Sequence, residues 1–529
     1  MLPRTTVRAA RASELRLRIK ALTLLAFCFV FATQSQRAQE RVHGTFSAPE
    51  VRLNEPTSSV VGTRPTVIPL GQTKVIVLWE DNRNEVAFQQ HTIFAQKLNY
   101  PELLSENLAL TLPDAFSTQP DAVVLKLQNE ILLSWQEYTR TLQHSNILTQ
   151  VFDTSLVQKG APFFASRDSM RYPVRPRIAA CDSIFALVWQ ESAERQASML
   201  RLFSTNTSPR TDTIRQNSGL VQNALLPSVA VRSDGSVFSA WIDKGASKRG
   251  VMLRSYSAQG TSMSIPRRLN EFTDDRQITK PEMIALQNGH VLCAWADARA
   301  GEWNVYAQFI DSDGLVYGGN IPVSNDLKPI TLSAVSLASS SGRILLVWEA
   351  MRDGQITIAG QWLRLDGSFL GSNAYLLDEG PWDGKIPHVA FTDGAAYLAW
   401  NDNRFSDQPN QFDVFVKKID VPADPSAVAF ADVEHSFKLH QNYPNPFSTS
   451  TTIRIDAHPS IVNGQLASLK LYDMMGREVN DLSHRLHAMS AFTHSITLQA
   501  SDFPQSGLYV YQMRARGRVE SRMMSVVKR

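Results

Sequence analysis

Carboxylate and guanidinium side chains recur at fixed distances after seven tryptophans, and they are the first residues whose types and spacing could support chemistry. An acid stands two residues after the tryptophan in six cases, at Asp81, Glu137, Glu191, Asp243, Asp297 and Asp402, and in the seventh Glu349 is shifted by one. An arginine follows at the fourth position in four cases, at Arg83, Arg299, Arg352 and Arg404. Such groups bind polar ligands, and they also pair with each other to fix turns.

Two interpretations of this pattern compete. In the functional one, the acids and arginines form a ring of ligand-binding groups on one face of the molecule. In the structural one, each acid caps its own turn and pairs with an arginine, while the tryptophan packs between repeats. Because the pattern recurs in nearly every repeat, whereas a catalytic site needs it only once, we favour the structural interpretation.

Motifs of known catalytic chemistry are absent from the sequence. It has no His-Glu-x-x-His, no Cys-x-x-Cys, no Gly-x-Ser-x-Gly and no phosphate loop. Turns such as Ser233-Asp-Gly235 lack the full ligand spacing of a calcium loop. We therefore predict no catalytic residue, no metal and no cofactor. A pair of acids of the kind used by glycoside hydrolases is compatible with the sequence, but nothing identifies which two.

The elements that must position these side chains follow from the tryptophan repeat. Each tryptophan ends an apolar run, as in Val75-Ile-Val-Leu-Trp79, and successive tryptophans lie 52 to 56 residues apart. A proline opens six units 13 to 15 residues earlier, at Pro65, Pro120, Pro176, Pro227, Pro281 and Pro387, whereas Pro329 in the sixth unit lies further ahead. Each unit reads as four strands, the first a short one after the proline. Seven such units predict a seven-bladed β-propeller, an all-β fold.

Unequal loops and the two chain ends add detail to this prediction. The stretch between the second and third strands is longest in units seven, one and two, which are neighbours in a closed ring, so we predict a binding sector there. Its candidate ligand-binding residues are Asp81, Arg83, Glu137, Asp402 and Arg404. The seventh unit lacks a fourth strand, and Val51-Arg-Leu-Asn54 resembles fourth strands elsewhere. We expect this amino-terminal strand to complete the last blade and close the ring.

Composition and the amino-terminal segment indicate an exported protein. The chain has 529 residues, 43% of them hydrophobic, and a net charge of +3. The part between residues 33 and 436 carries 36 basic and 43 acidic residues, which argues against nucleic-acid binding. Six basic side chains precede the apolar run Ala21–Ala32, so residues 1–32 read as a signal peptide. No other stretch is apolar enough to span a membrane, so the mature chain is expected to have no transmembrane segment.

The last 93 residues resemble a known export domain. They contain Gln441-Asn-Tyr-Pro-Asn-Pro-Phe447, Leu471-Tyr-Asp-Met-Met-Gly-Arg-Glu-Val479, Phe503-Pro-Gln-Ser-Gly-Leu-Tyr509 and Met524-Ser-Val-Val-Lys528. This resembles the type A carboxy-terminal sorting domain of the bacterial type IX secretion system. The resemblance places sorting-motif residues at Asn442, Pro444, Asn445, Pro446, Phe447, Gly476, Gly507, Tyr509 and Lys528. The immunoglobulin-like domain of flagellar-hook capping proteins is a weaker alternative. The resemblance implies transfer from the periplasm through an outer-membrane translocon.

The sequence as a whole predicts a signal peptide (1–32), a propeller (41–421), a linker (422–436) and a sorting domain folded as a small immunoglobulin-like β-sandwich (437–529). The middle also resembles propeller repeats of the Trp-x-Asp-x-Arg type. We expect a secreted or surface-displayed binding or adhesion module, with a glycan or an extracellular protein as its partner. The alternative is a glycan-degrading hydrolase resembling sialidase propellers, although their Ser-x-Asp-x-Gly-x-Thr-Trp box has no complete copy here. The sequence leaves catalysis open and favours a binding role.

Overall fold

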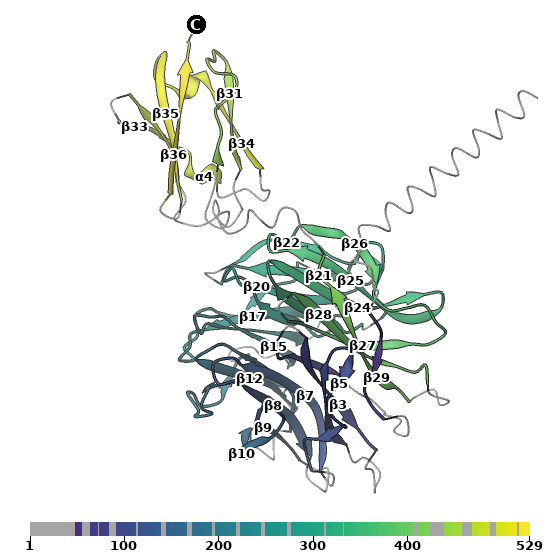
Figure 1. Ribbon diagram of the computed structural model, residues 1–529. Coiled ribbons are helices and arrows are strands. Elements are labelled where there is room, and N and C mark those ends of the chain that lie inside the picture. Colours follow the sequence, from purple (N-terminus) through teal and green to yellow (C-terminus); the bar gives the residue numbers. More distant parts are fainter. Residues whose placement is uncertain are drawn as a thin grey trace, which may run out of the picture.

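The computed structural model describes residues 48–528 apart from short internal segments, and all structural statements below concern these described residues (Figure 1). The segments left out are 56–63, 72, 84–90, 113–114, 139–143, 167–171, 193–195, 218–222, 245–248, 272–276, 312–313, 332, 393, 406–410, 423–437, 457–467, 475, 487–492 and 516–517. The predicted signal peptide lies outside the described residues, as does the predicted linker apart from Pro422.

The tryptophan repeats fold into seven antiparallel sheets, which we number as blades 1 to 7 in chain order. Blade 1 consists of β2 (Thr66–Pro69), β3 (Lys74–Asp81), β4 (Thr92–Asn99), β5 (Glu102–Leu103) and β6 (Leu108–Ala109). Blade 2 consists of β7 (Phe116–Leu125), β8 (Glu130–Tyr138), β9 (Ser145–Asp153) and β10 (Gln158–Ser166). Blade 3 consists of β11 (Pro173–Ala180), β12 (Ile184–Glu191), β13 (Ala197–Ser204) and β14 (Ile214–Arg215).

Blades 4 to 7 follow the same plan of four strands, with the tryptophan on the second. They consist of β15 (Asn223–Val231), β16 (Val237–Lys244), β17 (Arg249–Tyr256) and β18 (Arg267–Arg268); β19 (Glu282–Ala285), β20 (Val291–Asp297), β21 (Asn304–Ile310) and β22 (Val316–Pro322); β23 (Val335–Ser340), β24 (Arg343–Arg352), β25 (Gln355–Arg364) and β26 (Phe369–Tyr375); and β27 (Gly384–Thr392), β28 (Ala395–Asp402), β29 (Asp413–Asp420) and β1 (Val51–Arg52).

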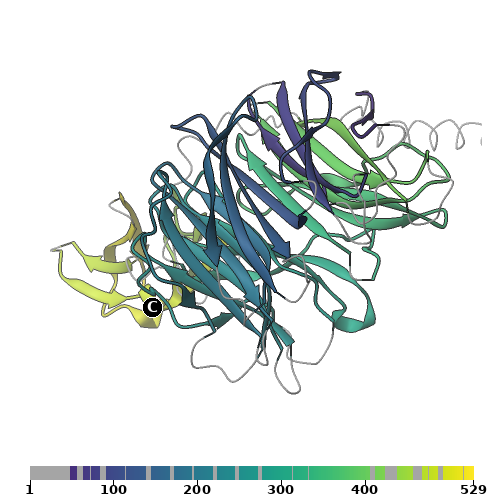
Figure 2. The same cartoon turned by 90° about the horizontal axis from the view of Figure 1, so that it is seen from below.

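The first strands of the seven blades form a closed ring. Each of β2, β7, β11, β15, β19, β23 and β27 contacts the next, and β27 contacts β2. Figure 2 shows the purple strands of blade 1 beside green strands of blade 7. The described residues thus form a β-propeller in which seven described sheets follow one another around an axis, with the first strands innermost.

The amino-terminal strand closes the ring, as predicted. Val51 pairs with Val416 and Arg52 with Phe415, both on β29. The side chain of Asn54 donates to Asp413 Oδ1 at 2.8 Å and accepts from the backbone N–H of Val414 at 2.9 Å. Asn270 in blade 4 accepts the equivalent bond from Val251. This shared cap explains why the sequence around Asn54 resembles the fourth strands.

Apolar cores lie between neighbouring blades, and the tryptophans fill them. Trp79 packs in a cluster with Tyr397 of blade 7, Trp135 in one with Leu78 of blade 1, and Trp295 in one with Phe238 of blade 4. Their exposed fractions are 0%, 4% and 0%. Burying a large aromatic side chain removes about 150–250 Å² from water. The repeat spacing is therefore the spacing of inter-blade contacts, as the structural interpretation requires.

The innermost strands differ from the prediction in one respect. We expected a short strand after each proline, and this holds for β2 and β19, which have 4 residues each. In blades 2, 3, 4 and 7 the strand instead begins before the proline, has 8 to 10 residues and is interrupted beside the proline by a register shift. Proline has no backbone N–H to donate to the neighbouring strand, and a bulge accommodates it because the pairing is already interrupted there.

The tail has its own two sheets and its own core. One sheet orders β30 (Lys438–Leu439), β31 (Ser450–Asp456) and β34 (Thr493–Gln499), and the other orders β33 (Glu478–Asp481), β32 (Ser468–Asp473), β35 (Gly507–Ala515) and β36 (Arg518–Val526). Short helices α4 (Ser483–Leu486) and η3 (Ala500–Asp502) join them. Ile453 and Leu498 of the first sheet pack in one cluster with Leu471 and Tyr511 of the second. An immunoglobulin-like arrangement of this pair of sheets stays a prediction.

Candidate ligand-binding site

The acid two residues after the tryptophan is a structural connector in the repeats that also carry the arginine. Asp297 accepts from Trp295 Nε1 at 2.8 Å, from the backbone N–H of Arg299 at 3.1 Å, and from Arg299 Nη2 at 2.7 Å. Asp81 and Asp402 make the same three kinds of bond within their own repeats. Both carboxylates are 0% exposed. Each acid therefore caps its turn and pairs with its arginine, as the structural interpretation predicted.

The arginine of each pair is held from a second side by an aromatic ring. The guanidinium of Arg83 lies 4.2 Å from the ring centre of Phe94, that of Arg299 lies 3.5 Å from Tyr306, and that of Arg404 lies 4.5 Å from Phe415. Such cation–π contacts add about 0.5–2 kcal/mol each. The guanidinium groups of Arg83 and Arg404, both predicted ligand-binding residues, thus already have carboxylate and aromatic partners.

The other acids of the series do not repeat this arrangement, and Glu137 and Glu349 show how they differ. Glu137 is half-buried and accepts from Trp135 Nε1 at 3.2 Å. The fourth residue after Trp135 is not an arginine, so this repeat lacks the ion pair. The sequence suggests that Glu349 is a shifted copy of these acids, but the structure gives it a different role. Its carboxylate accepts from the backbone N–H of Ile386 in blade 7 at 2.7 Å, so it joins two blades. Arg352 in that repeat pairs with Glu379 instead.

Glu349 directly follows Trp348, and the residues in the same position of blades 1, 2 and 3 make the same contact with the next blade. We call this hydrogen bond between blades the latch. Glu80, Gln136 and Gln190 accept from the backbone N–H of Gln119, Arg175 and Leu226 in the next blade, at 2.6, 3.3 and 3.1 Å. The four donors all precede a proline and have positive φ, 57° at Gln119, 59° at Arg175, 52° at Leu226 and 53° at Ile386. This strained backbone conformation costs about 1–3 kcal/mol per residue, which the latch offsets.

The backbone residues that the latch holds line a cavity at the axis of the propeller. A cavity of about 650 Å³ lies there, lined by residues of the innermost strands of all seven blades and the residues just before them. We call it the central channel. Its size falls within the range of about 300–1,000 Å³ that is typical of small-molecule sites. The strained residues Gln119, Arg175, Leu226 and Ile386 all line it.

Charged side chains gather in the central channel. Among its described lining residues, Arg64, Arg175, Arg177 and Lys280 are cationic, whereas Asp121 and Glu282 are acidic. His388 also lines it and accepts from the backbone N–H of Val67 in blade 1 through Nδ1 at 3.1 Å. These residues directly precede or follow the blade prolines. The proline-linked bulges therefore bring mixed charge, with an excess of two cationic groups over acids, to one cavity.

Each acid of the channel has partners of its own. Asp121 accepts from the backbone N–H of Ile178 in blade 3 at 3.0 Å. Glu282 forms an ion pair with Lys280 in the same blade and accepts from Ser228 Oγ of blade 4 at 3.4 Å. These contacts run around the axis, from one blade to the next. They fix the acids in place and leave the arginines as the channel groups with the fewest partners.

Enclosure by the protein shifts the pKa values of this cluster, although most of its side chains keep some surface towards the channel. Burial, with repulsion from Arg177 in the same direction, lowers the pKa of Lys280 to about 8 against the pull of Glu282. Burial lowers the pKa of His388 to about 4, so its imidazole is neutral at pH 7. Burial raises the pKa of Asp121. Burial alone would also raise the pKa of Glu282, but Lys280 and Arg177 outweigh it and lower that pKa.

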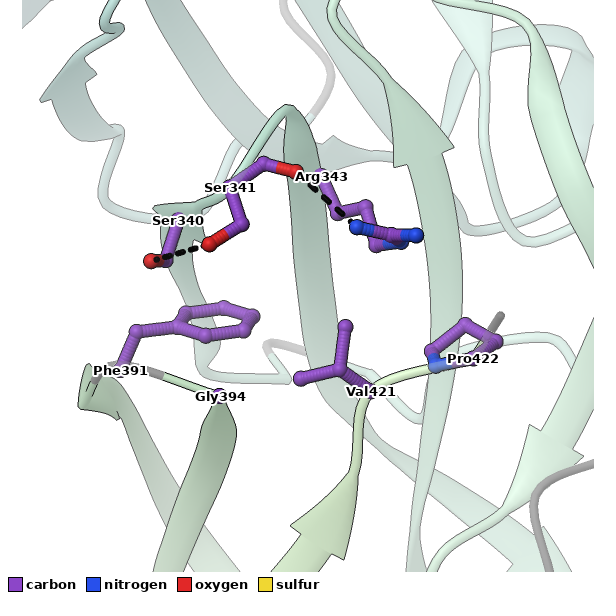
Figure 3. Close-up of a pocket in the computed structure, with 7 residues that line it drawn as sticks. All are labelled: Ser340, Ser341, Arg343, Phe391, Gly394, Val421 and Pro422. Carbon is purple, nitrogen blue, oxygen red and sulfur yellow. Dashed lines mark hydrogen bonds between the residues drawn. The ribbon is translucent and has the colours of Figure 1, made fainter. Parts of the chain in front are cut away.

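Two smaller hollows are weaker candidates. Figure 3 shows one of about 210 Å³ between blades 6 and 7, where the chain leaves the propeller. It is lined by Ser340, Ser341, Arg343, Phe391, Gly394, Val421 and Pro422, and its single charged group, Arg343, already donates to the carbonyl oxygen of Ser341 at 3.0 Å. The other, of about 300 Å³, lies beside Trp382 and contains the Arg352–Glu379 pair. Neither combines charged side chains from many blades as the central channel does.

The predicted binding sector can be placed only in part. Asp81, Arg83, Glu137, Asp402 and Arg404 lie at the ends of β3, β8 and β28, and residues 84–90, 139–143 and 406–410 of the long loops lie outside the described residues. Ligand binding by these five residues stays a prediction. Sequence reasoning missed the central channel because it used the prolines only to mark repeats. The available signal was the residue after each proline, which is polar in all six units that have one at the blade opening, as in Asp121, Glu282 and His388.

The predicted sorting-motif residues build the tail itself. Asn442, which is 2% exposed, donates to Thr451 Oγ1 at 2.8 Å, and its backbone N–H donates to the hydroxyl of Tyr511 at 2.8 Å. Phe447 packs against Phe503 in the tail core, and Asn445 accepts from the backbone N–H of Ser525 at 2.7 Å. Further members lie in turns, at strand ends or in the core: Pro444, Pro446, Gly476, Gly507, Tyr509 and Lys528.

The described residues include neither a candidate metal cluster nor a membrane-spanning helix. In this part of the chain, no group of three or more His, Cys, Asp or Glu side chains is suited to hold a metal ion. No helix there is long and apolar enough to cross a membrane. Cys181 and Cys293 are both free thiols.

Comparison with known proteins adds the following. A protein of unknown function from Dyadobacter fermentans matches with 10% identity and a TM-score of 0.44, over 70% of this chain and 98% of its own. The β-propeller domain of the Trilobed protease from Pyrococcus furiosus matches with 8% identity and a TM-score of 0.40, over 70% and 100%. The α-L-arabinanase of Penicillium chrysogenum, complexed with arabinobiose, matches with 11% identity and a TM-score of 0.41, over 71% and 98%. No curated protein sequence matches this chain.

A family model does match the tail. It is the secretion system C-terminal sorting domain, and it covers residues 441–527. The match agrees with the resemblance read from the Asn-Tyr-Pro-Asn-Pro-Phe segment and with the buried positions of Asn442 and Phe447. The tail of this all-β propeller protein is a type IX secretion sorting domain, and the chain is exported by that route to be secreted or displayed at the outer cell surface.

Proposed function

We propose that the exported propeller is a binding module and that its ligand occupies the central channel. The observation that carries this proposal is the gathering of charged side chains from blades 1, 2, 3 and 5 in one cavity of about 650 Å³. Enclosed cavities with a few converging polar groups are the usual form of a small-ligand site. The channel admits a small molecule or the end of a glycan chain. A glycan or the glycan of an extracellular protein is therefore the partner we propose.

Strain around the channel supports a functional role. Gln119, Arg175, Leu226 and Ile386 hold positive φ at its wall, and such strain is concentrated at functional sites. The latch residues Glu80, Gln136, Gln190 and Glu349 maintain that conformation from outside the wall. A wall fixed in this way is preorganised, so a ligand need not order it on binding.

Hydrolysis of a glycan is a second candidate, and one observation favours it. Asp121 and Glu282 both line the channel, and their pKa values are shifted in opposite directions, upward for Asp121 and downward for Glu282. Glycoside hydrolysis uses one carboxyl of raised pKa as general acid and a second carboxyl that stays ionised. In that case Asp121 would be the general acid and Glu282 the base or nucleophile.

A screen on the full secreted chain tests both candidates. Binding to a glycan array and hydrolysis of polysaccharides would be measured for the wild type, for Asp121→Asn, and for two plugs of the channel, Ala334→Trp and Ala122→Trp. Because the plugs come from different blades, misfolding of one does not decide the result. Arg210→Gln on the exposed outer rim is the control.

The outcomes separate the candidates. Binding without hydrolysis that a folded plug variant abolishes supports the binding module. Hydrolysis that Asp121→Asn abolishes supports the enzyme. A ligand whose binding is unchanged in both folded plugs contradicts the placement of the site in the channel, and would return attention to Asp81, Arg83, Glu137, Asp402 and Arg404.

A further inference from the structure

We propose that the central channel selects anionic ligands, and that Arg64 and Arg177 bind the ligand's carboxylate, sulfate or phosphate group. The inference rests on the proposed function, since it names the ligand class of the same site. Free small anions and anionic groups on a saccharide share this chemistry. The experiment below separates these two sources.

Neither guanidinium group has a described carboxylate within ion-pair distance. In the outer parts of the blades, by contrast, Arg83 is paired with Asp81 and Arg352 with Glu379. Arg177 donates to the carbonyl oxygen of the neighbouring Pro176 at 3.3 Å, and no ion pair within 4.0 Å joins Arg64 or Arg177 to a described carboxylate. A guanidinium left without an acid in an enclosed cavity is costly.

The acids of the channel are already engaged by other groups. Glu282 is held by Lys280 and Ser228, and Asp121 by the backbone N–H of Ile178. Turning either acid towards an arginine would break these contacts. The positive charge of Arg64 and Arg177 therefore remains available to a ligand that brings its own negative charge.

The cations of the channel repel one another. Arg64 stands before the first strand of blade 1 and Arg177 lies in that of blade 3. Burial and the charge of Arg177 lower the pKa of Arg64, and the attraction of Glu80 and Glu282 does not cancel this fall. The charge of Arg177 also adds to burial in lowering the pKa of Lys280. An anion placed between these groups would relieve the repulsion, and planar guanidinium groups bind carboxylate, sulfate and phosphate through two parallel hydrogen bonds.

The rest of the described channel lining carries many hydroxyl groups and almost no aromatic ring. Apart from the imidazole of His388, the described lining residues include no aromatic ring, so a neutral sugar finds no ring on which to stack. Hydroxyl groups are frequent instead, at Thr66, Ser228, Thr279, Ser333 and Ser336. Recognition in such a channel depends on charge and hydrogen bonding more than on apolar contact.

Calorimetric titration of the full secreted chain tests the inference. The probes are trigalacturonate and neutral galactotriose, which differ in their carboxylates, together with inorganic sulfate and inorganic phosphate. The variants are Arg64→Gln, Arg177→Gln and Arg177→Lys, with Arg210→Gln as the control that removes the same charge from the outer rim. Thermal midpoints of all variants are measured without ligand.

We expect an anionic probe to bind the wild type and Arg210→Gln with equal affinity, and to bind Arg64→Gln and Arg177→Gln roughly tenfold more weakly or worse. Arg177→Lys keeps the charge and should lose less. Binding should weaken as salt is raised. Without ligand, Arg177→Gln should melt no lower than the wild type, because it relieves repulsion. A purely structural role for Arg177 predicts the opposite, a lower thermal midpoint.

Binding of trigalacturonate alone identifies an anionic saccharide, and binding of sulfate or phosphate alone identifies a free anion. Equal binding of galactotriose and trigalacturonate, unchanged in the arginine variants but lost in Ala334→Trp, would overturn the inference while the channel as binding site stands. Failure of all four probes to bind at millimolar concentration would overturn the inference, and the glycan array would then decide the proposed function separately.

Discussion

At the scale of single residues, Glu80 is the latch residue of blade 1, whereas blades 2 and 3 have a glutamine in the same position. Gln136 and Gln190 make the same latch contact without a charge, whereas burial raises the pKa of Glu80 to about 7. The hydrogen bond from Gln119 and the charge of Arg64 oppose this rise, and His91 Nδ1 lies 3.9 Å away. Glu80, like Glu349 in the latch of blade 6, therefore binds its proton more tightly in the folded than in the unfolded chain.

The first prediction is that Glu80→Gln stabilises the protein at high pH only. With a folded pKa above the unfolded value, the stabilising contribution of Glu80 is complete below about pH 4.5 and is lost as the pH rises through 7. We expect Glu80→Gln to exceed the wild type by about 1–3 kcal/mol at pH 8 and to match it at pH 5. Urea unfolding at the two pH values measures this.

The reverse change in the next blade is the matched control. Gln136→Glu should destabilise the protein at pH 8 and leave it unchanged at pH 5, because it introduces the same buried carboxyl. If Glu80→Gln were destabilising at pH 8, an ionised Glu80 would be the better latch, and the direction of its pKa shift would be wrong.

A second prediction at this scale concerns Asp297. Asp297→Ala removes the acceptor of Trp295 Nε1 and of three donor groups of Arg299, and it leaves a stacked guanidinium without its carboxylate. We expect a loss of about 2–4 kcal/mol in the free energy of unfolding, measured by urea titration, with ligand binding in the channel unchanged. The double variant Asp297→Ala/Arg299→Ala should lose less than the sum of the single changes, and simple additivity would contradict the pairing.

Residue spacing predicted some of these roles and not others. The interval from Trp295 to Asp297 to Arg299 is local, so a turn cap and an ion pair could be inferred from the sequence. The latch could not, because the partner of Glu80 is a backbone N–H in the next blade, and such a donor leaves no trace in residue type. Arg64 and Arg177 stand next to blade-opening prolines in the sequence, but only the closure of the ring brings them to one cavity.

At the scale of elements, the innermost strands show what periodicity can and cannot predict. The apolar runs ending in tryptophan predicted the second strand of every blade, since alternation and burial follow the pleat. The bulges beside Pro120, Pro176, Pro227 and Pro387 were not predicted. Their extra residues depend on the latch, which is a contact between elements.

The third prediction is that β1 stabilises the whole ring. Removing residues 46–54 takes away the pairing of Val51 and Arg52 with β29 and the cap that Asn54 places on Asp413 and Val414. Leu53, which is 2% exposed, also leaves the core between blades 7 and 1. We expect a lower thermal midpoint and one cooperative transition, measured by calorimetry.

The single change Asn54→Ala is a milder test of the same closure. It removes the cap and keeps the strand, so its thermal midpoint should lie between those of the wild type and the truncated chain. An unchanged midpoint in the truncated chain would show that the ring is held closed by the contacts between β27 and β2 alone.

At the scale of the whole molecule, the propeller and the tail have separate cores. The tail cluster contains only residues from Leu439 to Val526, and the clusters of the propeller contain only residues from Val51 to Ile419. Because no described apolar cluster is shared, each part should keep its stability without the other. Export and ligand binding are then separable properties of the chain.

The last prediction uses this separation. Deleting residues 437–529 should leave the thermal midpoint of the propeller unchanged and retain the protein inside the cell envelope, as measured by calorimetry and by fractionation of cells and medium. Phe447→Ala should act in the same direction, because removing a Phe side chain that is 3% exposed costs about 3–5 kcal/mol in a core of this size. Met474→Ala, at an exposed side chain of the tail, is the control and should be exported normally. Secretion of the truncated chain at the wild-type level would show that the propeller carries an export signal of its own, and a lower midpoint would show that the two cores support each other.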